Sequence, residues 1–281
     1  MPTEILSIEI RVLTSIQDLQ AVQKLDKIVW NEQPIPLHQI ITSIQNGGLV
    51  LGAYDKDKLV GFSYSFAGFK NGRSYLCSHM LGIHPAYQEQ GIGAKLKMAQ
   101  LEKAREMGYS LITWTYDPLE SRNAFLNLSK LKAICSTYVE NCYGDMVDDL
   151  NNGLPSDRFK VEWWINSPHV KEKQTIEIEE PVSPFEIETT EKGHPKLLQV
   201  NCALQSIATN EILEQVLVPV PTSFQQIKKD DFDLAVDWRI KIRKIFQTHF
   251  NSGYVVCALQ KNVGNSVNFY VLVKKEKLRL S

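Results

Sequence analysis

The residues whose spacing most clearly suggests chemistry lie between positions 81 and 96. Here the sequence LGIHPAYQEQGIGAKL passes from an apolar run through a polar loop to two glycines, Gly91 and Gly93, that open a helix-forming stretch. Small residues at a helix start let backbone N–H groups approach an anion, and the helix dipole favours negative charge there. The segment lacks the Gly-Lys-Ser/Thr of a Walker loop, and Leu96 replaces the third glycine of the dinucleotide fingerprint. It therefore predicts a pyrophosphate cradle, with an ordinary glycine-rich helix start as the alternative.

The elements around this loop alternate between strand and helix signals. Strands are predicted over residues 8–13, 49–54, 59–68, 74–83, 111–116, 134–140, 158–165, 197–207, 215–220, 254–259 and 267–273, and helices over 19–29, 37–45, 91–107, 121–131 and 230–251. The Asn71-Gly72 pair predicts a hairpin turn, because both residues tolerate positive φ. An antiparallel meander followed by a strand–helix–strand unit predicts a mixed α/β (α+β) fold.

The chain divides near residue 170. An acidic segment with two prolines, residues 177–184, marks a connection. Beyond it, the helix predicted over 230–251 has five apolar residues on one face: Leu234, Trp238, Ile242, Ile245 and Phe246. The tail contains no phosphate loop and no cluster of metal ligands. We therefore expect residues 1–170 to form the main domain and residues 171–281 to form a smaller α/β extension packed on it.

Composition excludes several classes of protein. The 281 residues carry 31 basic and 32 acidic side chains, a net charge of −1 that gives no footprint for nucleic acid or an anionic membrane. No apolar run approaches the roughly 20 residues of a membrane helix, and the first residues do not resemble a secretory signal. Five widely spaced cysteines without a Cys-x-x-Cys pair argue against a disulfide framework or a structural zinc site. We expect a soluble, cytoplasmic protein that needs no metal.

The loop and its surroundings resemble motif A of the GCN5-related N-acetyltransferase (GNAT) superfamily. Gln88, Gly91 and Gly93 fit the pattern Gln/Arg-x-x-Gly-x-Gly/Ala in register, as do Pro85 and Tyr87 upstream. The order of elements over residues 8–165 also fits. The resemblance implies a largely antiparallel, twisted sheet flanked by helices, and acetyl-CoA or another acyl-CoA as co-substrate.

The resemblance also implies which residues hold the cofactor. The strand before the loop splays from its neighbour in this superfamily and pairs with the pantetheine arm, which would involve Leu81, Gly82 and Ile83. The loop amides that hold the phosphates would be those of Gln88, Glu89, Gln90, Gly91, Ile92, Gly93, Ala94 and Lys95. Asn123, which opens the next helix, matches the usual asparagine near the cofactor arm.

A narrower resemblance covers most of the chain and points to a little-characterised bacterial subgroup. It rests on the motifs SHM at 78–80, WTYDPL at 114–119, RNA at 122–124, YG at 143–144, PSDRF at 155–159 and EW at 162–163, and on tail residues including Trp238, Arg239, Arg243, Phe246 and the Gly253-Tyr254 pair. Some members of this subgroup resemble amino-acid N-succinyltransferases. This implies an acyl group that is larger than acetyl.

Acyl transfer to an amine needs a base for the ammonium and a proton for the leaving thiolate. His79 lies five residues before His84 on the central strand, where many relatives carry a glutamate, so we expect it to act as the base or proton relay; a packed strand histidine is the alternative. The superfamily's usual acid is a tyrosine in the helix after the fifth strand, but residues 123–131 contain no tyrosine. Tyr116, Tyr138 or Tyr143 could substitute, and we take Tyr138 as the candidate.

Charged residues near predicted strand ends are candidates for binding the acceptor. Asp117 follows the strand that ends at residue 116 and could act in catalysis or bind a substrate ammonium, or it could merely start a turn. Arg158 could grip a carboxylate in bidentate fashion, or it could pair locally with Asp157. Further carboxylate candidates are Arg122, Arg239 and Arg243.

These observations favour an acyl-CoA-dependent N-acyltransferase that acts by direct transfer on a small-molecule amine. The resemblance implies an amino acid as that amine, and we expect the tail to shape the acceptor pocket. A homodimer is compatible with the sequence. The alternative function is that of a degenerate relative that binds acyl-CoA as a sensor. Acetylation of protein N-termini stays open, because the sequence does not show whether a peptide groove exists.

Overall fold

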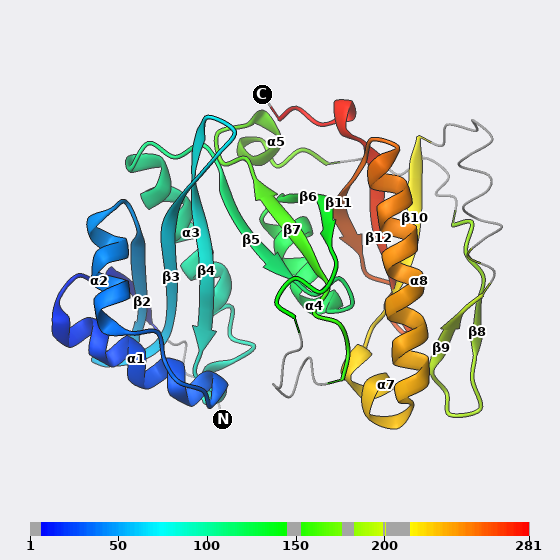
Figure 1. Ribbon diagram of the computed structural model, residues 1–281, viewed down its shortest axis with the longest axis horizontal. Helices are drawn as coiled ribbons and strands as arrows, with labels where there is room; N and C mark the ends of the chain where they lie inside the picture. The colour runs from blue at the N-terminus through cyan, green and yellow to red at the C-terminus, as the bar shows by residue number, and fades with distance from the viewer. Residues whose placement is uncertain (1–6, 145–152, 176–182, 199, 201–213, 281) are drawn as a thin grey trace. The chain divides into compact units, whose positions relative to one another are not determined.

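The computed structural model describes residues 7–144, 153–175, 183–198, 200 and 214–280 (Figure 1). Its contacts divide the chain into two compact units, Met1–Trp114 and Thr115–Ser281. Each unit combines helices with a largely antiparallel sheet, so the predicted mixed α/β class is confirmed. The division at Trp114 differs from the boundary expected near residue 170, which stays a prediction.

The first unit is built on strands in the order β1-β2-β3-β4-β5. Its elements are β1 (Ile8–Val12), α1 (Ile16–Trp30), α2 (Leu37–Gln45), β2 (Leu49–Asp55), β3 (Lys58–Lys70), β4 (Arg73–Ile83), α3 (Ile92–Glu106) and β5 (Ile112–Tyr116), whose last two residues belong to the second unit. The neighbours from β1 to β4 pair antiparallel, whereas β4 and β5 pair in parallel.

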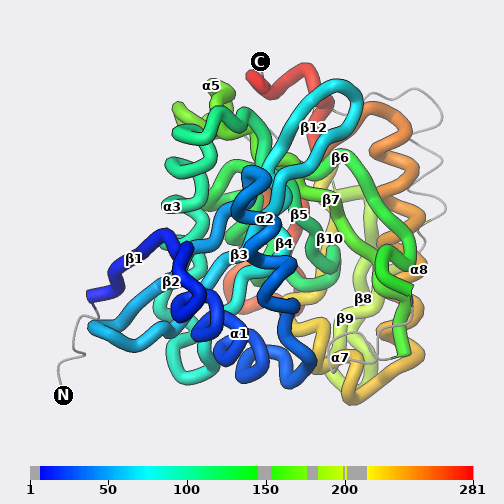
Figure 2. The backbone as a smooth tube through the Cα atoms, turned by 60° about the vertical axis from the view of Figure 1, so that its left-hand side comes forward, coloured from blue at the N-terminus to red at the C-terminus, as the bar shows by residue number. Residues whose placement is uncertain are grey.

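Helices α1 and α2 cover one face of these strands (Figures 1 and 2). Helix α1 begins at Ser15, whose hydroxyl accepts a hydrogen bond from the Asp18 N–H and so caps the first turn. The apolar residues of both helices pack on β2 and β3 in one core that contains Leu19, Val22, Leu25, Ile40, Val50, Phe62 and Tyr64. The hairpin between β3 and β4 turns at Asn71 and Gly72, which have φ of 53° and 73° as the sequence predicted.

The second unit holds strands in the order β7-β6-β11-β12-β10 and a separate β8-β9 pair. Its elements are α4 (Ser121–Ala124), a π-helical stretch (Phe125–Lys130), β6 (Ile134–Val139), β7 (Arg158–Trp163), α5 (Pro168–Lys171), β8 (Ile187–Thr189), β9 (Pro195–Leu197), β10 (Gln215–Pro221), α7 (Phe224–Asp230), α8 (Phe232–Asn251), β11 (Tyr254–Gln260) and β12 (Val267–Lys274).

Helix α8 packs on this sheet through the predicted apolar stripe (Figure 1). Trp238, Ile242, Ile245 and Phe246 are fully buried, and Leu234 is nearly so. Around the stripe, the Phe159 ring of β7 meets Phe246 edge-on at 4.6 Å. Strands from before and after residue 170 therefore share one core in this unit.

Most predicted elements are confirmed to within a few residues, with two corrections. The strand predicted over 197–207 is wrong at Val200, which is helical, and residues 199 and 201–207 lie outside the described part of the chain. The helix predicted over 230–251 is interrupted at Asp231, whose backbone is extended (φ −152°, ψ 84°). The Asp231 carboxylate caps α8 by accepting a hydrogen bond from the Leu234 N–H. Within the described ranges, none of the helices is long and apolar enough to cross a membrane.

Candidate functional site

The loop between β4 and α3 presents the features of an anion cradle. Gly91 is the N-cap of α3 and has a φ of 76°; a Cβ atom built there would meet nothing within 4 Å. Because glycine has no side chain to cap the helix, the first amides of α3 are left for an external acceptor. No acidic residue lies in the first turn of α3, which includes Lys95. This geometry fits a phosphate.

Two further contacts fix the loop. The Tyr87 hydroxyl donates to Asp55 Oδ2 over 3.0 Å, and the His84 imidazole accepts from the Ala86 N–H through Nδ1. A Cβ atom at Gly93 would lie 3.6 Å from Leu81, an ordinary contact. The start of α3 is therefore held close to the end of β4, where Leu81, Gly82 and Ile83 lie.

The pairing of β4 with β5 is short. Leu76 pairs with Ile112 and Cys77 with Thr113, and the pairs described between these strands stop there. On its other side β4 pairs with β3 along its whole length, from Arg73 to Ile83. The residues of β4 from Ser78 onward therefore continue beyond the described pairing with β5.

His79 lies on this stretch of β4. Its ring meets Tyr64 and Phe66 of β3, with centroids 6.1 and 5.6 Å away. The side chain keeps an exposed edge, but partial burial lowers its pKa below the usual 6.5, and the negative charge of Asp26 opposes that shift. Asp26 is a buried carboxylate of α1 whose Oδ2 accepts the Ile35 N–H, and burial raises its pKa. A histidine in this setting is neutral near pH 7 and can accept a proton.

A buried lysine that sequence reasoning missed lies on the face of α3 that packs on the sheet. Lys97 is 3% exposed, and its Nζ donates to Ser78 Oγ at 2.8 Å and to Gln100 Oε1 at 3.3 Å. The same Nζ lies 3.6 Å from the centroid of the Trp114 ring. Ser78 and Trp114 directly follow the last described pair of β4 and β5, so the ammonium contacts both strands where that pairing stops. Burial lowers the pKa of Lys97 to about 7.

A groove runs between α2 and β3. It has a volume of about 510 Å³ and is lined by His38, Gln39, Thr42, Ser43 and Asn46 of the α2 segment and by Tyr64, Phe66 and Ala67 of β3. Tyr64 and Phe66 are the two rings that His79 contacts. The His79 ring therefore lies beside the groove, behind two of its lining rings.

The comparisons with known proteins bear directly on this arrangement. The model of the Acetyltransferase (GNAT) family matches residues 13–126, a range that contains β2 to β5, α3 and the glycine loop. Residues 13–126 of the chain thus match a GNAT acetyltransferase domain. The predicted superfamily is thus confirmed, while the narrower bacterial subgroup stays a prediction.

Solved structures that resemble the chain include several acetyltransferases. One is yncA, a putative acetyltransferase from Salmonella typhimurium with its cofactor acetyl-CoA, with a TM-score of 0.48, 16% identity, and coverage of 57% of this chain and 95% of that one. Another is the ribosomal-protein-S18-alanine N-acetyltransferase from Escherichia coli, with a TM-score of 0.47, 15% identity, and coverage of 56% and 94%. No curated protein matches the sequence.

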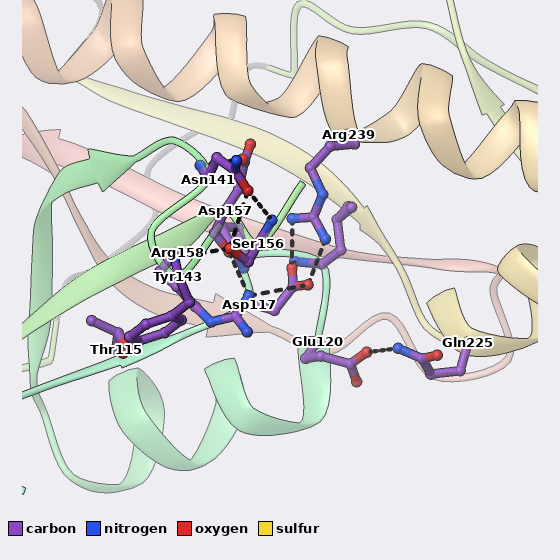
Figure 3. A network of polar contacts seen from close by, with 12 residues as sticks. Thr115, Asp117, Glu120, Asn141, Tyr143, Ser156, Asp157, Arg158, Gln225 and Arg239 are labelled. Carbon is purple, nitrogen blue, oxygen red and sulfur yellow. Dashed lines mark hydrogen bonds and ion pairs between the residues drawn. The ribbon is translucent and has the colours of Figure 1, made fainter. Parts of the chain in front are cut away.

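The match to the GNAT family ends at residue 126, and the other predicted site residues lie in the second unit. Asp117 follows β5, and both of its carboxylate oxygens are engaged (Figure 3). Oδ1 accepts the Leu119 N–H at 2.8 Å and Arg239 Nη1 at 2.8 Å, and Oδ2 accepts Arg239 Nη2. Arg239 is 2% exposed, so this is a buried, bidentate ion pair between the start of a turn and α8.

A second carboxylate of the same cluster is Asp157, which is fully buried. It accepts Arg243 Nε at 2.9 Å and Nη2 at 3.0 Å, and the Tyr138 hydroxyl donates to it over 2.7 Å. Burial raises the pKa of Tyr138 far above that of a free phenol, and the charge of Asp157 raises it further. The structure therefore brings Tyr138 together with Asp157, and in this state the phenol is a poor proton donor.

Arg158 completes the cluster. Its Nη1 donates to the Asp157 carbonyl at 2.9 Å and lies 3.9 Å from Asp117 Oδ2. Its guanidinium carbon lies 5.4 Å from the centroid of the Tyr143 ring, which is exposed and whose hydroxyl hydrogen-bonds Thr115. Three arginines thus surround two aspartates, the fully buried Asp157 and the partly buried Asp117. Asn123, on the exposed side of α4, makes no contact with this cluster that the structure describes.

Proposed function

We propose that the protein is an acyl-CoA-dependent N-acyltransferase that moves an acetyl or larger acyl group, such as succinyl, to the amine of a small molecule, an amino acid in the first instance. The observation that supports it most strongly is the glycine-capped start of α3 directly after β4, inside a GNAT domain. The GNAT family membership supports the acyltransferase class, and the larger acyl group rests on the narrower sequence resemblance alone.

The residues of the first unit fit an acyl-CoA. The α3 amides and the loop from Gln88 to Lys95 would hold its phosphates, and Leu81, Gly82 and Ile83 of β4 would pair with its pantetheine arm. When bound, acyl-CoA supplies a thioester carbonyl that an amine can attack. Acetyl-CoA is the cofactor present in the structure of yncA, to which this chain is similar.

His79 would prepare the amine. The neutral imidazole takes one proton from the acceptor's ammonium, which frees the nitrogen lone pair for attack on the thioester carbon. A C–N bond forms, the C–S bond breaks, the nitrogen gives up a second proton as the amide forms, and the departing thiolate takes up one proton, so that one proton is released overall. Tyr138 is the predicted source of that proton, although its hydrogen bond to Asp157 and its raised pKa oppose donation.

Arg158 would bind the carboxylate of an amino-acid acceptor. Its placement against an exposed tyrosine, in a cluster with two other arginines and two aspartates, supports anion binding. Asp117 would act as the orienting carboxylate for Arg158 and Arg239, since both of its oxygens already accept hydrogen bonds. The absence of a tyrosine from residues 121–131 favours one alternative, a relative that binds acyl-CoA without turnover.

The deciding experiment measures thiol release from acetyl-CoA and succinyl-CoA over a panel of amino acids, together with CoA binding by calorimetry. Gly91→Glu should abolish CoA binding, because a side chain and a negative charge would enter the anion cradle. Gly108→Glu is the matched control, because Gly108 also has positive φ and open space, at the other end of α3. Equal CoA affinity of the two variants would contradict the cofactor site. CoA binding without thiol release would establish the alternative.

A further inference from the structure

The groove between α2 and β3 has a lining that restricts what it can hold. Of its eight lining residues none is Asp, Glu, Lys or Arg, and His38 is the one titratable side chain besides Tyr64. Gln39, Thr42, Ser43 and Asn46 supply amide and hydroxyl groups along one wall, and the Tyr64 and Phe66 rings form part of the other. Its volume, about 510 Å³, falls in the range of small-molecule sites.

The polar wall is a regular feature of α2. Residues 39, 42 and 43 and the C-cap residue 46 recur at helical spacing, so they lie along one side of the helix, while Ile40 is buried on another face. The Ser43 hydroxyl donates to the Ser65 carbonyl, and the Asn46 amide donates to the Thr42 carbonyl, which holds these two side chains in place. Gln39 and Thr42 are exposed toward the groove.

The groove also has a defined relation to the proposed base. Tyr64 and Phe66 both line the groove, and their ring centroids lie 6.1 and 5.6 Å from that of His79, so a molecule whose amine reaches His79 would extend past these rings into the groove. A charged group placed there would find no Asp, Glu, Lys or Arg among the groove's residues and only the His38 imidazole as a titratable neighbour, whereas a neutral amide would find several hydrogen-bonding partners.

We infer that this groove binds the side chain of the amino-acid acceptor and selects side chains that are uncharged and carry amide, hydroxyl or aromatic groups. The inference rests on the proposed function for the acceptor's identity as an amino acid. The groove acts as a specificity site: it distinguishes acceptors that share the same reacting amine.

Glutamine and glutamate provide a matched pair of acceptors, because they differ only in amide against carboxylate. At saturating acyl-CoA, we expect kcat/KM for glutamine to exceed that for glutamate by about ten-fold or more. Thr42→Lys places a cation inside the groove and should shift this ratio toward glutamate by about ten-fold. Gln45→Lys is the control. It adds the same charge to the same helix, but at an exposed residue that does not line the groove.

Two outcomes would overturn the inference: glutamate used as well as glutamine by the wild-type protein, or an equal shift of the ratio by both lysine variants. If the wild-type protein releases no thiol with any amino acid, the proposed catalysis fails, and calorimetry on the CoA-bound protein then decides about the groove. Binding of glutamine over glutamate that Thr42→Lys reverses would uphold the site. Absence of that preference in binding would refute it.

Discussion

Replacing Lys97 with methionine should flatten the dependence of the first unit's stability on pH. The ammonium is 3% exposed, and no carboxylate among the described residues forms an ion pair with it. Burial therefore lowers its pKa from 10.5 to about 7. The hydrogen bonds to Ser78 and Gln100 and the contact with the Trp114 ring offset only part of the cost of burying the charge.

The sign follows from the protons that each state holds. Between pH 7 and 10.5 the unfolded chain keeps a proton on Lys97 that the folded chain has lost, so the free energy of unfolding rises with pH. The full slope is about 1.4 kcal/mol per pH unit. Because the folded group is half titrated at pH 7, the rise from pH 7 to pH 9 should be about 2 kcal/mol. Methionine at this position removes that contribution.

Methionine also removes two hydrogen bonds. It leaves the Ser78 hydroxyl and the Gln100 carbonyl without their present donor, at roughly 1–3 kcal/mol for each buried group. This cost is the same at every pH, whereas the cost of the buried lysine is largest near and below pH 7. The free energies of unfolding of the two proteins should therefore converge or cross toward low pH and separate toward pH 9.

Urea unfolding at pH 7, 8 and 9, followed by tryptophan fluorescence, measures the effect. The difference between wild type and Lys97→Met should change by about 2 kcal/mol over this range. Lys103→Met is the control on the same helix, because the Lys103 side chain reaches the surface, where it pairs with Glu106. If the difference in free energy of unfolding between wild type and Lys97→Met stayed constant with pH, Lys97 would have the same protonation in the folded and the unfolded state. That result would refute the reasoning from burial.

Further predictions concern the base, the buried ion pair and the tail. His79→Ala should lower kcat by about 10²-fold while the protein still folds, and an unchanged kcat would make His79 structural. Because the pKa of His79 is lowered, wild-type activity should persist as the pH falls to 6.5 and decline only below it. Asp117→Asn should lower stability by about 3–5 kcal/mol, since it leaves Arg239 buried without its counter-charge, and thermal unfolding would contradict this if it matched that of the surface control Glu140→Gln. A chain ending at residue 175 should lose amine turnover and solubility, because it lacks α8 and the strands β8 to β12 of the second unit. Unchanged kinetics of a soluble truncated protein would show that the tail has no part in acceptor binding.

Local sequence signals predicted the elements well where they were strong. The Asn71-Gly72 turn and the apolar stripe of α8 are confirmed, because each depends on backbone preference or periodicity within a few residues. The π-helical stretch at Phe125–Lys130 was predicted only as helix, since i→i+5 bonding leaves no distinct local pattern.

The site was harder to predict, because its polar residues depend on partners far along the chain. Lys97 reads as an ordinary surface lysine of a helix whose apolar residues are spread around its axis. Its burial depends on Ser78, nineteen residues away, and on Gln100, whose amide in turn donates to Ser65. The Lys97–Gln100 spacing on the buried side of α3 was the one local signal. The groove beside His79 likewise requires α2 and β3 to be packed together.

The arginines of the tail show how one helix can fix two separate motifs. Arg239 and Arg243 lie one turn apart on α8, and each forms a bidentate contact with an aspartate that the sequence presented separately: Asp117 after β5 and Asp157 before β7. Pairing at 122 and 86 residues' separation could not be deduced from the sequence, which offered each charge as an independent candidate. Each pair has a buried member, Arg239 in one and Asp157 in the other, and that member needs its counter-charge. The same contacts that position Arg158 and Tyr138 also hold the tail to the rest of the second unit. The tail is therefore bound by ion pairs as well as by the Phe246 packing, and a change in either aspartate should disturb the residues proposed to recognise a carboxylate.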